Sequence, residues 1–305
     1  MANKKIKKIR RLDAGDICGG SFSSALIGEQ LIPRLKVMRE NGGVAPSLSG
    51  LSTGFPSLEG MLDGLHAGEL IIVAGGTCMC EEKLVKQIAL NVAINQGIKV
   101  AYFSTGKSRS VVLSNLICLD AKIGWNDLNC NRLSEQEWQS FSKSAEKICG
   151  APIIINDISA DPRVLRKEVK KLFSNSDSKP GLIIFDKVPS GDDCNSAIGR
   201  KLSTFSEELI GIARNNNVPV IALAGISRDV EERKYKSPML KDVASADGIH
   251  WYADTVITVV RDVIYDPDTV HPDFAHVSVL KSFYGLIGGF QLVLNQPSGY
   301  FSQLQ

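Results

Sequence analysis

The chain has 305 residues, enough for one large α/β domain or two small ones, and its 44% hydrophobic and 22% charged residues are typical of globular proteins. The formal net charge is only +2, so any affinity for nucleic acid must come from a local patch. Seven scattered cysteines without zinc spacing favour a reducing, cytoplasmic compartment, and we expect no metal site. No apolar run reaches the roughly 18 residues of a membrane span, so we expect no membrane partner.

The first 45 residues differ in composition from the rest. Residues 1–22 are basic and then rich in Gly and Ser, which predicts a disordered tail, with an arm that contacts nucleic acid as the alternative. Residues 23–40 carry apolar side chains at helical spacing, and Pro33 would kink or divide this helix. Residues 41–50 have the composition of a linker. The apolar stripe consists of Leu26, Ile27, Leu31, Leu35 and Met38.

From residue 51 onward, short apolar runs alternate with helical patterns. We predict strands at 69–75, 99–104, 152–157, 181–186 and 218–225, and helices at 83–97, 110–124, 135–149, 162–175 and 196–217. Three further strands, at 255–262, 276–282 and 290–295, follow in a hairpin pattern. The pattern predicts an α/β fold with a mostly parallel sheet, helices on both faces and antiparallel C-terminal edge strands.

The stretch LIIVAGGTCMCEEKLVKQIALNVA, residues 70–93, has the strand–turn–helix pattern of a phosphate-binding loop but lacks its key residues. Gly75 fits the first glycine, whereas Cys80, Glu81 and Glu82 stand at the second glycine, the lysine and the Ser/Thr. Like charges 4 Å apart repel by about 1 kcal/mol in water and about 4 kcal/mol at a dielectric of 20. We therefore predict a degenerate nucleotide site, formed by Gly75, Gly76, Thr77, Cys78, Met79, Cys80, Glu81 and Glu82.

A structural role for the two carboxylates is also open. Acidic residues in the first turn of a helix stabilise it by about 0.3–1 kcal/mol each through the helix dipole. In this interpretation Thr77 or Cys78 lies near the helix cap, and the protein's own anions occupy the place that would attract phosphate.

From about residue 46 to the C-terminus, the chain resembles the C-terminal RecA-like motor domain of bacterial replicative DNA helicases of the DnaB type. LSTGFPSLEGMLDGLHAGELIIVAGG resembles that family's entry into its first core strand, LNCNRLSEQEWQSFSKSAEKICGAPIIIND its middle segment and LIIFD its Walker B strand. NNNVPVIALAGISRDVEERKYKSPMLKDV and ADTVITVVRDVIYDPD resemble the segments that follow. The resemblance implies a RecA-like P-loop NTPase fold for residues 46–305. It also implies a linker helix at 23–45 that docks on a neighbouring subunit.

The departures from this family concern its catalytic residues. Gly106 aligns with the catalytic Glu, Gly225 with the Gln at the end of the fourth core strand, and Phe283 with the arginine finger, while Lys281 and Gly285 remain. Asp186, the Walker B carboxylate, survives, and its structural role would be to pair with a cation such as Lys187. The resemblance then implies loss of catalysis and no cofactor, with Mg·ATP bound only if the degenerate site still accepts it. Lys83 and Lys107 are the candidates to replace the lost lysine.

Two segments align with the DNA-contacting loops of the family. The first, at 189–201, has Arg200 and Lys201 as its only cations. The second, at 228–242, interleaves cations with Tyr235, and a solvated loop of mixed charge is the alternative. Its cations are Arg228, Arg233, Lys234, Lys236 and Lys241.

We therefore expect a catalytically inactive paralogue of the DnaB-type helicase that acts by binding in DNA replication. The expected partner is the replicative helicase or another replication protein, with DNA as a further candidate. Two alternatives stay open. One is an active ATP-dependent DNA helicase with a relocated lysine, and the other is a homo-oligomeric ring or filament with a structural role.

Overall fold

The computed structural model describes residues 48–175, 179–188, 197–243, 248–283 and 285–304, and within 197–204 only the backbone. The predicted tail at 1–22, the docking helix at 23–45 and most of the first DNA-contacting loop lie outside the described residues. Arg200 and Lys201 lie in the first turns of a helix, but their side chains are among those not described.

The described residues form one sheet whose strands run in the order β3-β2-β4-β5-β1-β6-β7-β8-β9. Every neighbouring pair from β3 to β6 is parallel, and the pairs from β6 to β9 are antiparallel. The strands are β1 (Leu70–Gly75), β2 (Val100–Ser104), β3 (Ile153–Asp157), β4 (Leu182–Asp186), β5 (Val220–Gly225), β6 (Thr255–Val260), β7 (Phe274–Lys281), β8 (Gly288–Asn295) and β9 (Tyr300–Gln303).

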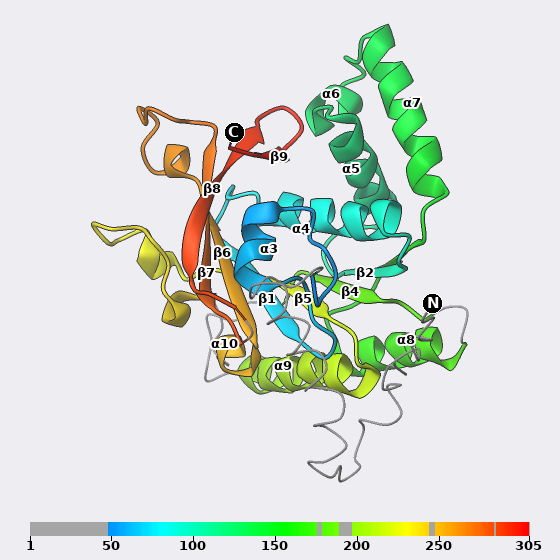
Figure 1. Cartoon of the computed structure of the whole chain (residues 1–305), viewed down its shortest axis with the longest axis vertical. Coiled ribbons are helices and arrows are strands. Elements are labelled where there is room, and N and C mark those ends of the chain that lie inside the picture. The colour runs from blue at the N-terminus through cyan, green and yellow to red at the C-terminus, as the bar shows by residue number, and fades with distance from the viewer. Residues whose placement is uncertain (1–47, 176–178, 189–196, 244–247, 284, 305) are drawn as a thin grey trace, which may run out of the picture.

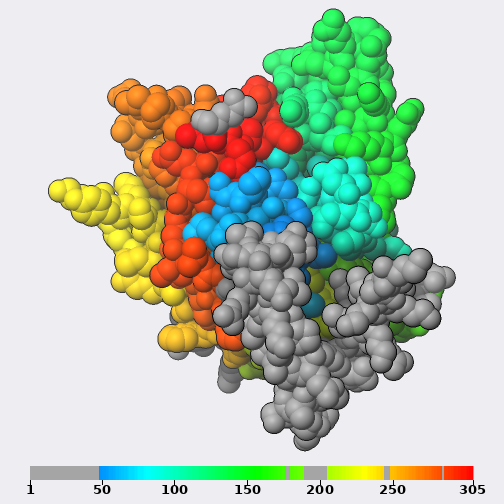
Figure 2. All heavy atoms as spheres, viewed as in Figure 1, coloured from blue at the N-terminus to red at the C-terminus, as the bar shows by residue number. Residues whose placement is uncertain are grey.

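Helices cover both faces of this sheet, as Figure 1 shows. Buried side chains of α3 (Pro56–Leu62), α4 (Glu81–Leu90), α5 (Arg109–Ala121) and α7 (Glu135–Cys149) pack on one face. The other face is covered by α8 (Pro162–Ser174), α9 (Ala197–Asn216) and α10 (Ile249–Tyr252). A π-helical turn, Asn91–Asn95, extends α4, and the short α6 (Trp125–Asn129) follows α5. In Figure 2, the segments from α5 to α7 protrude from the body in green.

The α/β fold and the parallel-then-antiparallel sheet predicted from the sequence are confirmed. Every residue of β1, β2 and β4 is buried, which explains their continuous apolar runs. The bounds of α7 match the prediction because Ser134 and Glu137 form a capping box at its start. The predicted elements do not include α3, α6, α10 and β9, which have seven, five, four and four residues and are too short to show a period.

Among the described residues, no helix is long and apolar enough to cross a membrane. Within the same ranges, no three His, Cys, Asp or Glu side chains are grouped so that they could hold a metal ion.

Candidate functional site at the end of β1

In the loop between β1 and α4, two cysteines have a backbone conformation that glycine usually adopts. Cys78 has φ 64° and Cys80 has φ 66°, both in the left-handed region that glycine favours. Cys80 directly precedes α4 and occupies its N-cap position, without a side-chain cap. The interpretation that Thr77 or Cys78 lies near the cap is therefore wrong by two or three residues, because the loop continues to Cys80 before the helix begins.

The side chain of Glu81 folds back into this loop. A Cβ atom added to Gly75 would lie 2.4 Å from Oε2 of Glu81, so the carboxylate fills the space that the missing side chain leaves open. The same carboxylate accepts a hydrogen bond from the Glu81 backbone N–H. Burial raises the pKa of Glu81, and the positive charge of Lys187 opposes this rise. One backbone N–H at the end of the loop is thus already hydrogen-bonded to a carboxylate of the protein itself.

Glu82 forms ion pairs with two lysines. The ammonium groups of Lys86, one helical turn later, and of Lys107, from the loop after β2, both contact its carboxylate. The side chain of Lys86 is 0% exposed and that of Lys107 is 38% exposed. Burial alone would raise the pKa of Glu82, but the two lysines outweigh it and lower this pKa to about 2. Glu82 is therefore ionised and its charge is neutralised within the protein.

Asp186, at the end of β4, lies behind this ion-pair cluster. The hydroxyl of Tyr102 in β2 donates a hydrogen bond of 2.7 Å to Oδ2 of Asp186. Burial, and secondly the charge of Glu82, raises the pKa of Asp186. The expected pairing with Lys187 is wrong: the Lys187 side chain is exposed, and its backbone N–H donates to Oγ1 of Thr105 at 3.2 Å.

The two candidate replacement lysines point to different places. Nζ of Lys83 lies 3.3 Å from Oδ1 of Asn115 in α5, and its aliphatic stem packs against Gly299 in the β8–β9 turn. Lys107 contacts the loop, but only through Glu82. A cavity of about 370 Å³ lies between these lysines and is also lined by Cys80 and Trp125. Of the two, Lys107 is therefore the one that the fold brings to the β1–α4 loop from another part of the sheet.

Arg261, directly after β6, connects the loop to the sheet, and it was not among the predicted site residues. Its Nη1 donates to the carbonyl of Cys78 at 3.1 Å, and its backbone N–H lies 3.1 Å from the sulfur of Met79. Its Nε is buried without a hydrogen-bond partner among the described residues. Lys86 and Tyr102 were missed as well, because a lysine in a helix and a tyrosine in a strand carry no sequence signal for a partner far along the chain.

Two of the three positions that align with catalytic residues of the resembled family, Gly106 and Gly225, lie at the carboxyl ends of parallel strands, near the β1–α4 loop. The third, Phe283, lies at the opposite edge of the sheet, because β7 is antiparallel to β6 and its end pairs with the start of β6. A Cβ atom on Gly106 would meet nothing within 4 Å, and Gly225 is the register partner of Gly75. Phe283, at the β7–β8 turn, is 74% exposed. Gly285 in that turn packs so closely on α3 that an added Cβ would lie 1.6 Å from the carbonyl oxygen of Met61. Lys281 anchors the turn by donating to the carbonyl of Ala253 at 2.5 Å.

The second candidate DNA-contacting loop projects from the body of the molecule, where it appears in yellow in Figure 2. Arg233 is used inside the protein, because its guanidinium forms a two-pronged ion pair with the buried Asp242 and lowers the pKa of that carboxyl. Nζ of Lys236 donates to the carbonyl of Glu231 at 2.7 Å. The exposed residues of the loop include Arg228, Lys234, Tyr235 and Lys241.

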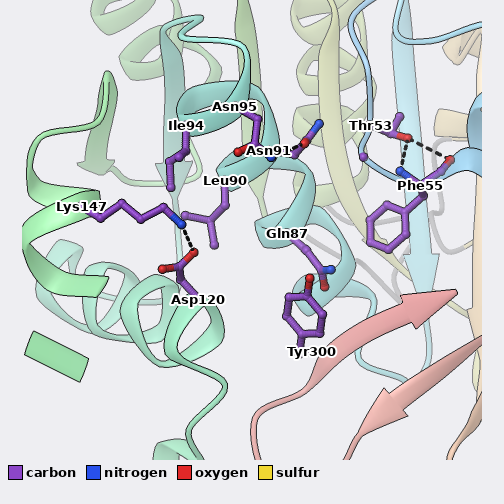
Figure 3. Close-up of a pocket in the computed structure, with 11 residues that line it drawn as sticks. Thr53, Phe55, Gln87, Leu90, Asn91, Ile94, Asn95, Asp120, Lys147 and Tyr300 are labelled. Carbon is purple, nitrogen blue, oxygen red and sulfur yellow. Dashed lines mark hydrogen bonds and ion pairs between the residues drawn. The ribbon is translucent and has the colours of Figure 1, made fainter. Parts of the chain in front are cut away.

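A second cavity, of about 170 Å³, lies on the outer side of α4 and is drawn in Figure 3. Gln87, Leu90 and Asn91 line it from one side, and the ion pair of Lys147 with Asp120, at 2.7 Å, closes another. None of the residues predicted for the nucleotide site lines this cavity.

Comparisons with known proteins agree with the fold. Residues 50–303 match the family model described as DnaB-like helicase C terminal domain. A curated relative, the "Probable replicative DNA helicase" of Trieres chinensis, is 30% identical over 278 residues, which cover 89% of this chain and 60% of the relative. The chain spans less than two thirds of the length of this relative and of two other curated relatives.

Among the solved structures that share the fold are two that cover nearly the whole chain. One, described as an ATPase domain, has a TM-score of 0.80 at 23% identity, covering 94% of this chain and 100% of that chain. "The Structure Of A DnaB-Like Replicative Helicase And Its Interactions With Primase" has a TM-score of 0.79 at 22% identity, covering 94% of this chain and 67% of that one.

Proposed function

Because the chain belongs to the DnaB-like helicase C-terminal domain family, we propose that it acts in DNA replication as a helicase-like domain that binds partners and does not hydrolyse ATP. The observation that carries this proposal is the position of the Glu81 carboxylate, which lies against Gly75 and accepts a hydrogen bond from the backbone N–H of its own residue. In a working phosphate loop, the backbone N–H groups of the loop surround the phosphates instead.

The residues present do not fit a magnesium-bound triphosphate. Such a ligand needs a lysine for the β/γ charge and a hydroxyl for the metal, and Glu81 and Glu82 stand at those two positions. Lys86 and Lys107 are nearby, but both neutralise Glu82. A triphosphate in the loop would have to displace one carboxylate and compete with a second.

Hydrolysis is tested with the purified chain, Mg·ATP and single-stranded DNA, by release of inorganic phosphate. We expect no turnover above a mock purification from cells without the chain. Turnover that disappears in the isosteric Asp186→Asn variant would overturn the proposal. It would favour the alternative of an active helicase, and loss of the same turnover in Lys107→Ala would identify the replacement lysine.

The role of the two carboxylates is tested by restoring the family residues. The triple variant Cys80→Gly/Glu81→Lys/Glu82→Thr should bind Mg·ATP more tightly than the natural chain in calorimetry. Since Glu82→Thr leaves Lys86 without its counter-charge, the same triple variant with Lys86→Met is measured beside it. The control is Glu135→Thr/Glu146→Lys, which makes the same charge change on exposed positions of α7 and should bind no better than the natural chain. Unchanged binding in both restored variants would contradict the charge argument.

The partner that this proposal favours is a subunit of the replicative helicase, in the cytoplasm. The support is membership of the family, together with the apolar stripe that the sequence places at 23–40. A tagged chain should capture the replicative helicase from its native cell, and deleting residues 1–45 should abolish this capture while circular dichroism shows an unchanged fold. Capture that persists after deletion would contradict the docking role. Light scattering that shows a closed homo-oligomer without helicase would favour the structural ring.

The exposed cations and Tyr235 of the 228–242 segment support DNA as a second ligand. Lys234→Ala/Lys241→Ala should weaken the binding of a fluorescent single-stranded oligonucleotide severalfold at low salt. Arg233 is left in place because its ion pair with Asp242 holds the segment together. Equal binding by the variant and the natural chain would show that these two lysines do not contact DNA.

A further inference from the structure

On the face of the sheet opposite α4, the outer side of α8 carries a stripe of positive charge. Its five cationic side chains recur at helical spacing over about 12 Å of helix, and all are exposed. The only acidic residue of α8 is Glu168, which pairs with Lys171 at 2.6 Å. No described residue forms an ion pair with Arg163, Lys167 or Lys170. The stripe consists of Arg163, Arg166, Lys167, Lys170 and Lys171.

Beside this stripe, α8 and α9 leave a groove of about 350 Å³ between them. Val169, Phe173 and Ile212 give the groove an apolar lining, and Arg166 and Lys170 stand at its rim. The Arg166 guanidinium is fixed there by a two-pronged contact to Glu208, whose side chain is only 9% exposed. An apolar floor and a cationic rim therefore lie side by side on one surface.

We propose that the α8–α9 groove docks an acidic peptide that inserts an apolar side chain between the helices and places its carboxylates along the cationic stripe. The positive charge of the stripe favours a peptide with carboxylates, and the apolar floor of the groove favours a peptide with an apolar side chain. The chain's own first residues, with six cations in the first eleven, carry the wrong charge for this stripe.

The lining of the groove favours a peptide over a nucleic acid. Nucleic-acid surfaces of this kind offer aromatic rings on which bases stack, whereas this floor has aliphatic side chains and a single half-buried ring, Phe173. The proposal does not depend on whether the loop at Glu81 binds nucleotide.

The probe is a fluorescein-labelled peptide of six aspartates followed by Leu-Phe, measured by fluorescence anisotropy on the full chain. Binding should weaken by about tenfold or more in Lys167→Glu/Lys170→Glu, because two favourable charges become repulsive. Arg132→Glu/Lys143→Glu makes the same charge change on exposed positions outside α8 and α9 and should bind like the natural chain. A probe with asparagine in place of aspartate should also lose binding.

The apolar half of the proposal has its own variant. A Cβ atom at Gly211 in α9 would meet only Nδ2 of Asn215, at 3.8 Å, so Gly211→Leu can fill the groove without a backbone clash. This variant should keep or raise the melting temperature, because leucine favours a helix more than glycine does, and yet lose peptide binding. Loss of peptide binding together with retained stability separates a blocked groove from a damaged fold.

Three results would overturn the proposal. The first is peptide binding that neither variant changes, or no binding of the probe at millimolar concentration. The second is that a six-nucleotide single-stranded DNA binds more tightly than the peptide, and that the charge reversal weakens this DNA binding while Gly211→Leu leaves it unchanged. This result would make the stripe a nucleic-acid surface. The third is self-association of the natural chain that Lys167→Glu/Lys170→Glu abolishes, which would make the groove an interface between copies.

Discussion

The ammonium group of Lys86, with none of its side chain exposed, forms an ion pair with the carboxylate of Glu82, which also receives Lys107. A charge as deeply buried as Lys86 is costly to leave without a partner, whereas Lys107 is partly hydrated and can return to water. Loss of the Glu82 carboxylate should therefore cost much more stability through Lys86 than through Lys107.

The first prediction follows from this difference. Glu82→Gln should lower the free energy of unfolding by about 3–5 kcal/mol, since it leaves Lys86 buried without a counter-charge. Lys107→Gln should lower it by only about 0–1 kcal/mol, because Glu82 keeps Lys86. Urea denaturation measures both variants. A loss of similar size in the two would mean that Lys86 finds another partner or is deprotonated in the natural chain.

The second prediction concerns acid. The pKa of Glu82 is about 2 in the folded protein, against an ordinary value of 4.5, so its stabilising contribution is complete above pH 4.5 and is lost as the pH falls toward 2. The loss amounts to about 3 kcal/mol. Burial raises the pKa values of Glu81 and Asp186 instead, so they change stability in the opposite direction.

Glu82→Gln keeps those two carboxyls and provides the comparison for the acid effect. The stability difference between the natural chain and this variant should shrink as the pH falls from 4.5 to 2. A difference that stays constant across this range would show that the pKa of Glu82 is not depressed.

The third prediction uses the left-handed backbone of Cys80. Cys80→Gly should stabilise the fold by about 1 kcal/mol, because glycine adopts a φ of 66° without the steric cost of a Cβ atom. Cys80→Ala is the matched control. It removes the thiol but keeps Cβ, so it should not gain stability. Equal melting temperatures for the Gly and Ala variants would show that the loop relaxes around either residue.

The fourth prediction compares two glycines. Gly285→Ala should destabilise the protein by about 2–4 kcal/mol and loosen the β7–β8 turn, since its Cβ cannot fit against the carbonyl of Met61. Gly106→Ala should stay within about 0.5 kcal/mol, because open space surrounds that position. Hydrogen exchange at Leu286, whose N–H donates to Met61, would report the loosening directly.

The sequence predicted the fold well because its signals are local. The buried runs of β1, β2 and β4 need no long-range information, and the capping box at Ser134 fixes the start of α7. The interior of the candidate site was less accessible. The partners of Glu82 include Lys107, 25 positions away, and Tyr102 is 84 positions from Asp186, so no periodicity connects them. The sequence predicted departures from the family pattern at Glu81 and Glu82, but it carried no signal that two lysines would neutralise Glu82.

The burial of Lys86 also bears on how the loop can change over generations. A single Glu82→Thr substitution toward the family pattern would isolate a buried positive charge, and Lys86→Met alone would remove one of the two cations that keep Glu82 ionised. Each first step is therefore expected to be harmful, although the two changes together would be tolerated. The ion pair therefore couples the two positions: with both charges in place, a change toward the family's residue at position 82 requires a coordinated substitution four residues away.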